Sequence, residues 1–182
     1  EIIIINQANS KECQLITTLA KQKQINIIHV DKQWAQKRYN IEGHQQILAK
    51  LSHIETKPIS ILSPETHPIV IALDHLEDPF NVGAIIRTAE GLGVSAIIIP
   101  KNRQAPLDSG VVKASSGACY YLDIVQVSNI GQALDHLNKN GYWLYGANSN
   151  NGQSLHKFEP VAPMVLVVGN EHKGLSNRII NM

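Results

Sequence analysis

The hydrophobic pattern of this chain divides it into a small part, a proline-rich connection and a larger part. In the small part, three apolar runs that predict strands alternate with segments of helical periodicity; the runs lie at residues 2–5, 25–30 and 47–51. Ser10 and Asp31 stand where two helices would begin, and both residue types are good N-caps. Residues 58–68 contain three prolines and little periodicity, which is typical of a linker. We therefore expect a small α/β domain over residues 1–57, a linker over 58–68 and a larger domain over 69–182.

The larger part is predicted to alternate strands and helices regularly. Apolar runs predict five strands, at residues 69–73, 95–99, 122–127, 142–145 and 164–168. Helices are expected at residues 81–92, 109–114 and 130–140 and after residue 174. Asn81 is the expected N-cap of the first of these helices, and Gly93 its expected end. Nearly continuous apolar strands that alternate with helices are typical of an α/β fold with a mostly parallel sheet covered by helices on both faces. Ligands of such sheets bind beyond the carboxyl ends of the strands.

Composition narrows the class of protein. Of 182 residues, 43% are hydrophobic and 17% charged, which is ordinary for a globular protein. No apolar stretch approaches the length of a membrane span, and no signal-peptide pattern is present. Cys13 and Cys119 match no metal-binding spacing, and the eight histidines include no H-x-x-x-H, so we expect no metal site. The sparse cysteines also lead us to expect that the protein resides in the reducing cytoplasm.

The net charge of +1 is unevenly distributed. Residues 1–57 carry eight Lys and Arg against five Asp and Glu, whereas residues 58–182 carry eight against ten. A basic small part weakly suggests a polyanionic partner. An ordinary solvated surface is the simpler interpretation of the charge by itself.

Two polar segments, each following a predicted strand, carry the candidate chemistry. They are Asn81-Val-Gly-Ala-Ile-Ile-Arg87 and Gly169-Asn-Glu171-His-Lys-Gly174. Together they supply an amide, a guanidinium and a carboxylate, with glycines that let backbone approach a ligand. The simpler alternatives are a solvated Arg87 and a Glu171 that only stabilises the last helix through its dipole. The loop at residues 74–80 is longer and more charged than a connection requires, which favours a site.

Three well-known loop types do not fit these residues. Leu175 stands where a P-loop requires Lys. Gly91-Leu-Gly93 lacks the third glycine of a dinucleotide-binding loop and follows a helix instead of preceding one. Residues 115–117, Ser-Ser-Gly, lie outside a G-x-S-x-G frame, so a hydrolase nucleophile is not predicted.

The two segments together resemble the first two motifs of the SpoU (TrmH-like) family of RNA ribose 2′-O-methyltransferases. The first motif, Asn-x-Gly-x-x-x-Arg-Thr-Ala, is met by Asn81, Gly83, Arg87, Thr88 and Ala89, and the second, Gly-x-Glu-x-x-Gly-Leu, by Gly169, Glu171, Gly174 and Leu175. Residues 112–118 are similar to the family's middle segment, and the resemblance covers residues 69–180. It implies a SPOUT-type fold with a trefoil knot, one of the rare exceptions to the rule against knots.

The resemblance also implies an activity, a cofactor and a set of site residues. The implied reaction is methyl transfer from S-adenosylmethionine to a ribose 2′-hydroxyl by a cytoplasmic homodimer, with no membrane and no metal involved. Catalytic roles fall to Arg87, Asn81 and Glu171, with Glu171 orienting either of the other two. Arg87 either accepts the proton or stabilises the alkoxide while phosphate or water takes it. Cofactor contacts are expected from Gly146, Ala147, Gly169, Asn170, Gly174 and Leu175, and RNA contacts from Lys113, Ser115 and His44.

The small domain resembles the L30e-like RNA-binding domain that precedes the catalytic domain of 23S ribosomal RNA guanosine methyltransferases. His44-Gln45 is similar to that domain's final His-Gln-Gly, with Gln46 in place of glycine. The implied substrate is therefore a 23S rRNA guanosine. A transfer RNA methyltransferase of the same family and a non-catalytic RNA-binding protein remain alternatives. The family's third motif, a Ser-Leu-Asn segment that completes the cofactor pocket and the knot, does not occur before Met182. We therefore expect the chain as it stands to bind cofactor poorly.

Overall fold

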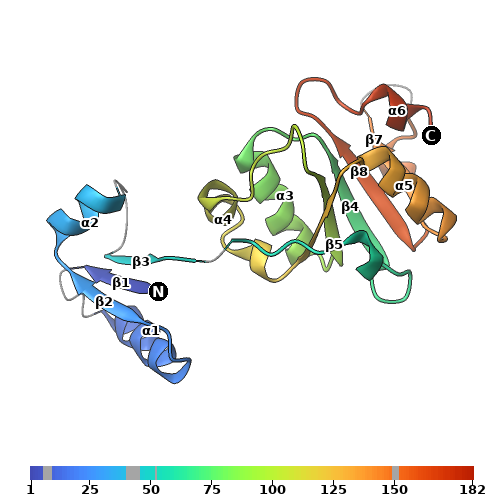
Figure 1. Cartoon of the computed structure of the whole chain (residues 1–182). Helices are drawn as coiled ribbons and strands as arrows, with labels where there is room; N and C mark the ends of the chain where they lie inside the picture. Colours follow the sequence, from blue (N-terminus) through green and yellow to red (C-terminus); the bar gives the residue numbers. More distant parts are fainter. Residues whose placement is uncertain (6–9, 40–45, 52, 149–151) are drawn as a thin grey trace. The chain divides into compact units, whose positions relative to one another are not determined.

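The computed structural model describes residues 1–5, 10–39, 46–51, 53–148 and 152–182. The chain forms two compact units, Glu1–Ser52 and His53–Met182 (Figure 1). Within the described residues, no helix has the length and apolar character that crossing a membrane requires.

The small unit is built on a three-stranded sheet with β1 in the middle. β1 (Ile2–Ile5) pairs in parallel with β2 (Ile27–Val30) and antiparallel with β3 (Ile47–Ala49). The helices are α1 (Lys11–Gln22) and α2 (Lys32–Tyr39). The two predicted caps are confirmed, because Ser10 accepts from Cys13 N and Asp31 accepts from Trp34 N at 2.7 Å.

The larger unit is built on a five-stranded, wholly parallel sheet of order β6-β5-β4-β8-β7. The strands are β4 (Ile69–Asp74), β5 (Ala96–Pro100), β6 (Asp123–Val127), β7 (Trp143–Ala147) and β8 (Met164–Gly169). The helices are α3 (Pro79–Gly91), α4 (Ser109–Ala114), α5 (Ile130–Lys139) and α6 (Asn177–Ile180), with short 3-10 turns η1 (Ile59–Ile61), η2 (Ala118–Tyr120) and η3 (Leu155–Lys157). The predicted parallel α/β sheet is confirmed. Strand order reverses beside β4, so β4 and β8 are neighbours although they are far apart in sequence.

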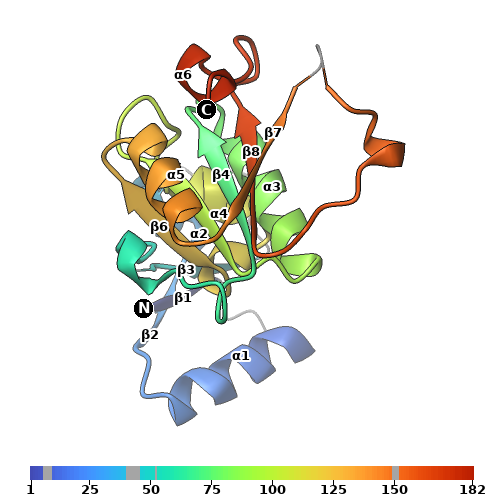
Figure 2. The same ribbon diagram turned by 90° about the vertical axis from the view of Figure 1, so that its right-hand side faces the viewer.

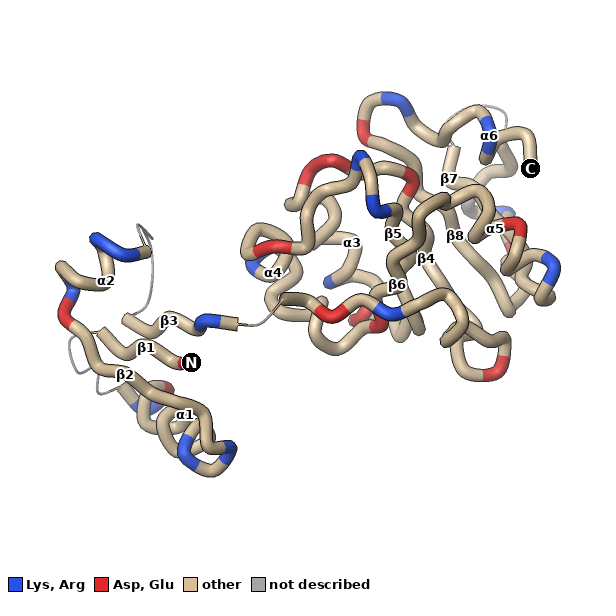
Figure 3. Tube along the Cα trace, in the orientation of Figure 1, with Lys and Arg blue, Asp and Glu red and all other residues tan. Residues whose placement is uncertain are grey.

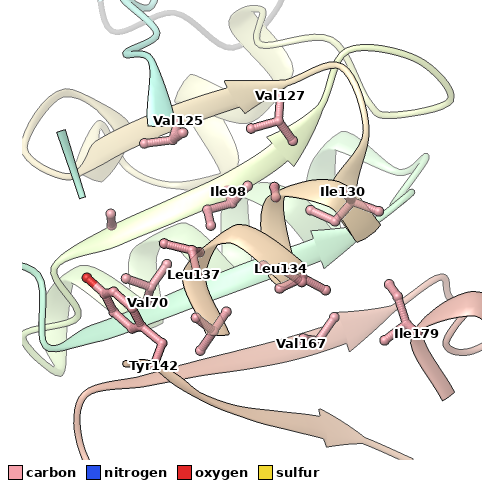
Figure 4. Close-up of a cluster of buried hydrophobic side chains, with 14 of the residues drawn as sticks. Val70, Ile98, Val125, Val127, Ile130, Leu134, Leu137, Tyr142, Val167 and Ile179 are labelled. Atoms are coloured by element: carbon pink, nitrogen blue, oxygen red, sulfur yellow. The ribbon is translucent and has the colours of Figure 1, made fainter. Parts of the chain in front are cut away.

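Alternate side chains of the inner strands enter cores on opposite faces of this sheet. Val70 and Ile98 pack with α5 on one face, whereas Leu73 and Ile97 pack with α3 on the other. Figures 1 and 2 show α3 and α5 on these two faces, and Figure 4 shows the α5 core. Burial of both faces explains why the strands are continuous apolar runs in the sequence.

Helix α3 begins two residues earlier than predicted, and Asn81 is not its cap. Asp78 has the extended backbone of an N-cap, and its carboxylate accepts from Phe80 N at 2.9 Å. Pro79 follows at the first helical position, where its fixed φ suits a helix and its missing N–H costs nothing. The Asn81 side chain is therefore free for another partner.

The predicted linker is part of the larger unit. Lys57 bridges to β6, accepting from Gln126 N and donating to Ile124 O at 2.8 Å. The Lys57 ammonium also lies 2.6 Å from Asp123 and, as the largest influence, holds the pKa of that carboxyl below its ordinary value. Ile59, Ile61 and Leu62 pack against the α5 core. The division between the units falls at residues 52 and 53, because these apolar and ionic contacts bind the proline-rich segment to the sheet.

Gly83 is predicted to be essential for the contact between α3 and α4. A Cβ added there would lie 2.4 Å from Ala114 Cβ and 2.9 Å from the backbone N of Ser115. We expect Gly83→Ala to destabilise the chain by about 1–3 kcal/mol in urea unfolding, as overpacking does. Gly91→Ala is the matched control, since a Cβ there meets nothing within 4 Å, and it should be neutral or stabilising by up to about 1 kcal/mol. Equal stability of the two variants would contradict this packing.

Candidate active site

The two polar segments meet at the carboxyl edge of the sheet, where β4 and β8 end side by side. Asp74 is paired with Gly169 in the strand register. Beyond this pair, the Asn170 amide donates to His75 O at 2.7 Å. Ser176 N donates to the Asp74 carboxylate, also at 2.7 Å. These bonds hold the loop after β8 against the end of β4, so residues about a hundred positions apart share one site.

The loop from Gly169 to Gly174 is a tight hairpin centred on Asn170. Asn170 and Gly174 exchange two backbone hydrogen bonds of 2.9 Å, and the Asn170 side-chain oxygen accepts from His172 N and Lys173 N. A Cβ on Gly169 would lie 2.2 Å from the backbone carbonyl carbon of Gly174. Gly174 has a left-handed φ of +66°. Both glycines are thus required by the hairpin itself, without any ligand.

Glu171 joins the second segment to the first. Its carboxylate accepts from the Asn81 amide at 3.2 Å and from Asp78 N at 3.4 Å. Burial acts to raise the pKa of Glu171, but hydrogen bonds from backbone amides and from Asn81 outweigh it, so the pKa lies below its ordinary value. Because an ionised carboxylate only accepts, Asn81 must present its NH₂ to Glu171. The Asn81 oxygen is then oriented to accept a proton donor from a ligand.

Arg87 lies on the exposed surface of α3, six residues beyond Asn81. No hydrogen bond or ion pair of Arg87 is found in the part of the chain that the structure describes. Of the two partners expected for Glu171, the structure therefore brings only Asn81 to it. Arg87 keeps an unpaired guanidinium, which suits an anionic ligand.

The residues expected to bind cofactor are divided between two pockets. We call the first the β7 pocket; it has a volume of about 380 Å³ and is lined by Gly146 and Leu175 together with Tyr145, Asn148 and Met182. The second, the α5 pocket, has about 400 Å³ and is lined by Asn170 and Gly174 among others. Ala147 ends β7 in register with Val168, and Gly169 ends β8. The expected set is thus spread along one edge of the sheet.

The three residues expected to contact RNA differ in their exposure and in whether the structure describes them. Lys113 is exposed in the last turn of α4. Ser115 has no exposed surface, and its hydroxyl donates to Val112 O at 3.2 Å, so we no longer assign it an RNA contact. His44 lies outside the described residues. No group of three or more potential metal ligands is found among the residues described.

Asp74 and His75 are site residues that the sequence analysis missed. Asp74 is only 2% exposed, although it is charged, and His75 has a left-handed φ of +63°. An acidic residue directly after an apolar strand was the available signal. Its burial depends on the loop after β8, which no local pattern reveals.

The larger unit of the chain is similar to known proteins. Residues 68–182 match the model of the SpoU rRNA Methylase family. An uncharacterized tRNA/rRNA methyltransferase of Synechocystis is 40% identical over 114 residues, which are 63% of this chain and 30% of the relative. A putative TrmH family tRNA/rRNA methyltransferase of Staphylococcus aureus is 39% identical over 110 residues, 60% of this chain and 44% of the relative. The chain thus spans less than half the length of these relatives.

Two solved structures share the fold. The AdoMet-bound rRNA methyltransferase of Sinorhizobium meliloti matches with a TM-score of 0.77 at 20% sequence identity. The match covers 99% of this chain and 66% of the Sinorhizobium chain. The SpoU methyltransferase AviRb of Streptomyces viridochromogenes matches with a TM-score of 0.76, also at 20% sequence identity. The match covers 99% of this chain and 68% of the AviRb chain.

Asn170 is predicted to hold the site together. Asn170→Ala removes the bond to His75 O and the side-chain oxygen that accepts from both loop amides, so the hairpin should open more often. We expect hydrogen–deuterium exchange at Lys173 and Gly174 to rise about tenfold, equivalent to about 1.4 kcal/mol of lost local stability. His172→Ala alters an exposed side chain of the same loop and should leave the exchange rates nearly unchanged. An equal rise in both variants would show that Asn170 has no special role.

Proposed function

This chain belongs to the SpoU rRNA methylase family, and on that premise we propose that it transfers a methyl group from S-adenosylmethionine to a ribose 2′-hydroxyl of RNA. The observation that carries the proposal is the hydrogen bond between Asn81 and Glu171. It joins the two polar segments at the edge of the sheet where ligands of parallel α/β folds bind. The 2′-hydroxyl makes RNA, not DNA, the substrate class.

The reaction needs a positioned and deprotonated hydroxyl. The ribose oxygen forms a bond to the methyl carbon while the carbon–sulfur bond breaks, and the hydroxyl proton must leave. S-Adenosylmethionine supplies the methyl group on a sulfonium cation, whose positive charge is neutralised by the transfer. The Asn81 oxygen, oriented by Glu171, accepts a hydrogen bond from a ribose hydroxyl and fixes its direction.

Arg87 is assigned to the developing negative charge. Its exposed guanidinium stabilises the alkoxide and holds an adjacent phosphate, while phosphate or water takes the proton. This role suits an arginine better than that of general base, because the guanidinium stays protonated in proteins. Glu171 is then a positioning residue, since it acts through Asn81.

The β7 pocket is the proposed cofactor site. Its volume of about 380 Å³ lies within the range of small-molecule sites, about 300–1,000 Å³. Leu144, Val167 and Leu175 give it apolar walls, and Gly146 exposes backbone to it. An adenosine group needs this combination of apolar faces and backbone hydrogen-bonding groups. Leu175, which lines the pocket, directly follows the Gly169–Gly174 loop that carries Glu171.

We further propose ribosomal RNA as the substrate, with a 23S rRNA guanosine as the target, in a cytoplasmic homodimer. The small α/β unit and its resemblance to an L30e-like RNA-binding domain support this choice. Transfer RNA is the second candidate, because both curated relatives carry tRNA as well as rRNA in their names.

Arg87→Ala tests the catalytic assignment. We expect kcat/KM for methyl transfer to transcribed 23S rRNA to fall about 10²–10³-fold, as when one charge-stabilising donor is lost. S-Adenosylmethionine affinity, which we expect to be weak in this chain, should change less than about twofold when measured by calorimetry. Lys139→Ala, an exposed cation at the far end of α5, is the matched control.

The product must also be identified. Nuclease digestion and mass spectrometry should place the methyl group on a ribose, and an Arg87→Ala variant as active as the control would remove Arg87 from the mechanism. A base-methylated product would refute the proposed 2′-O chemistry.

A further inference from the structure

We propose that the α5 pocket binds a phosphate group of the RNA strand next to the reacting ribose, with Arg103 as its principal ligand. The inference rests on the proposed function for the identity of the polyanion, and it adds a separate binding site to it. The pocket opens among the end of β4, the loop after β5, the start of α5 and the loop after β8. The loop after β8 connects it to the proposed reaction centre, because Glu171 binds Asn81 while Lys173 lines the pocket.

The charges around the α5 pocket favour an anion. Arg103, Lys173 and Arg178 line it from three different segments, and all three are exposed. Arg178 is paired with Asp135 at 3.3 Å, so Arg103 and Lys173 are the two cations proposed to meet the anion. Figure 3 shows these basic segments on the loops after β5 and β8 and at α6. Two acidic residues also line the pocket. Asp74 is buried and already accepts from Ser176 N, so Glu77 is the acidic side chain exposed to solvent there.

The start of α5 adds uncharged donors to the same pocket. This helix has ten residues, and Asn129 satisfies the amides of Gln132 and Ala133. The amides of Ile130 and Gly131, which precede them, have no acceptor within a helix by its geometry, and both residues line the pocket. Amides at a helix start are favourable partners for phosphate oxygens.

Arg103 is positioned by His75, which in turn lies beside the buried Asp74. Arg103 Nη2 lies 3.3 Å from His75 Nε2. Because a guanidinium only donates, Nε2 must accept, and the ring proton is then on Nδ1. Nδ1 lies 3.5 Å from Asp74 Oδ1, and neither of these buried atoms has a hydrogen-bond partner in the described part of the chain.

The backbone at His75 and Arg103 is strained. His75 and Arg103 both have left-handed φ angles, +63° and +54°, which L-residues seldom adopt. Strained backbone of this kind persists where a side chain must be aimed, and it clusters at ligand sites. A phosphate accepts two parallel hydrogen bonds from a guanidinium, so an oriented Arg103 fits such a ligand.

The α5 pocket differs from the β7 pocket in the polarity of its walls. Asn102, Ser128 and Asn129 give it polar walls, whereas the β7 pocket is walled mainly by aliphatic side chains. The two pockets therefore suit different parts of a complex, the RNA backbone and the cofactor.

The test measures binding of the whole chain to a fluorescein-labelled, single-stranded RNA of twelve uridines by anisotropy, at several KCl concentrations. We expect Arg103→Ala to weaken binding about tenfold and to reduce the slope of log K against log salt by about 0.7, the value for one phosphate contact on a single strand. Lys139→Ala should match wild type. The Arg103→Ala/Lys173→Ala double variant should lose no more slope than Arg103→Ala alone, because Lys173 faces the same phosphate and does not hold it once Arg103 is removed.

His75→Asn tests the positioning role, since Asn tolerates a left-handed φ but is too short to reach Arg103. It should weaken binding less than Arg103→Ala and leave the salt slope unchanged, because the phosphate contact persists with a less well-oriented guanidinium. Wild-type affinity in His75→Asn would overturn this role. Circular dichroism confirms that each variant is folded.

Two results would overturn the phosphate site itself. Arg103→Ala could behave like Lys139→Ala, or the double variant could lose twice the slope of the single one, which would place the cations on separate phosphates. Failure of the proposed function is distinguishable, because it would appear as absent methyl transfer by a wild-type chain whose RNA binding still depends on Arg103.

Discussion

Two hydrogen bonds from the loop after β8 to the end of β4 determine the geometry of the whole site. The Asn170 amide holds His75 O, and the Ser176 amide holds the Asp74 carboxylate. They place Glu171 beside Asn81 on one side of the loop and Lys173 beside the α5 pocket on the other. Because β4 and β8 are adjacent only through the reversal of strand order, the fold itself brings these residues together.

The carboxyl edge of the sheet accordingly offers three different environments. Beside the start of α3, the Asn81 amide and the ionised Glu171 carboxylate of the loop after β8 form the proposed ribose site. The β7 pocket is apolar with an exposed glycine backbone, as an adenosine group requires. The α5 pocket is polar and cationic, as a phosphate requires. A strand of RNA and a methyl donor could therefore meet above one loop without competing for the same side chains.

Periodicity and short motifs predicted the sheet well because both faces of its inner strands are buried, so each of these strands is an apolar run. They failed where tertiary contacts decide. Asp78 and Asn81 are both good capping residues, and Pro79 was the overlooked signal that α3 begins earlier. The prolines of residues 58–68 suggested a linker, yet apolar side chains bind that segment to the core. Ser115 lies in a motif-like segment but is buried against α3. Neither pocket was predictable, since each collects residues from four or more separate segments.

In the proposed mechanism, Asn81 and Glu171 act as one unit at the reaction centre. A double-mutant cycle measures this directly, with Asn81→Ala, Glu171→Ala and the double variant compared in single-turnover methyl transfer to 23S rRNA. If Glu171 acts only by orienting Asn81, the double variant should be no slower than Asn81→Ala alone. Rate losses that multiply in the double variant would show independent roles and contradict the account.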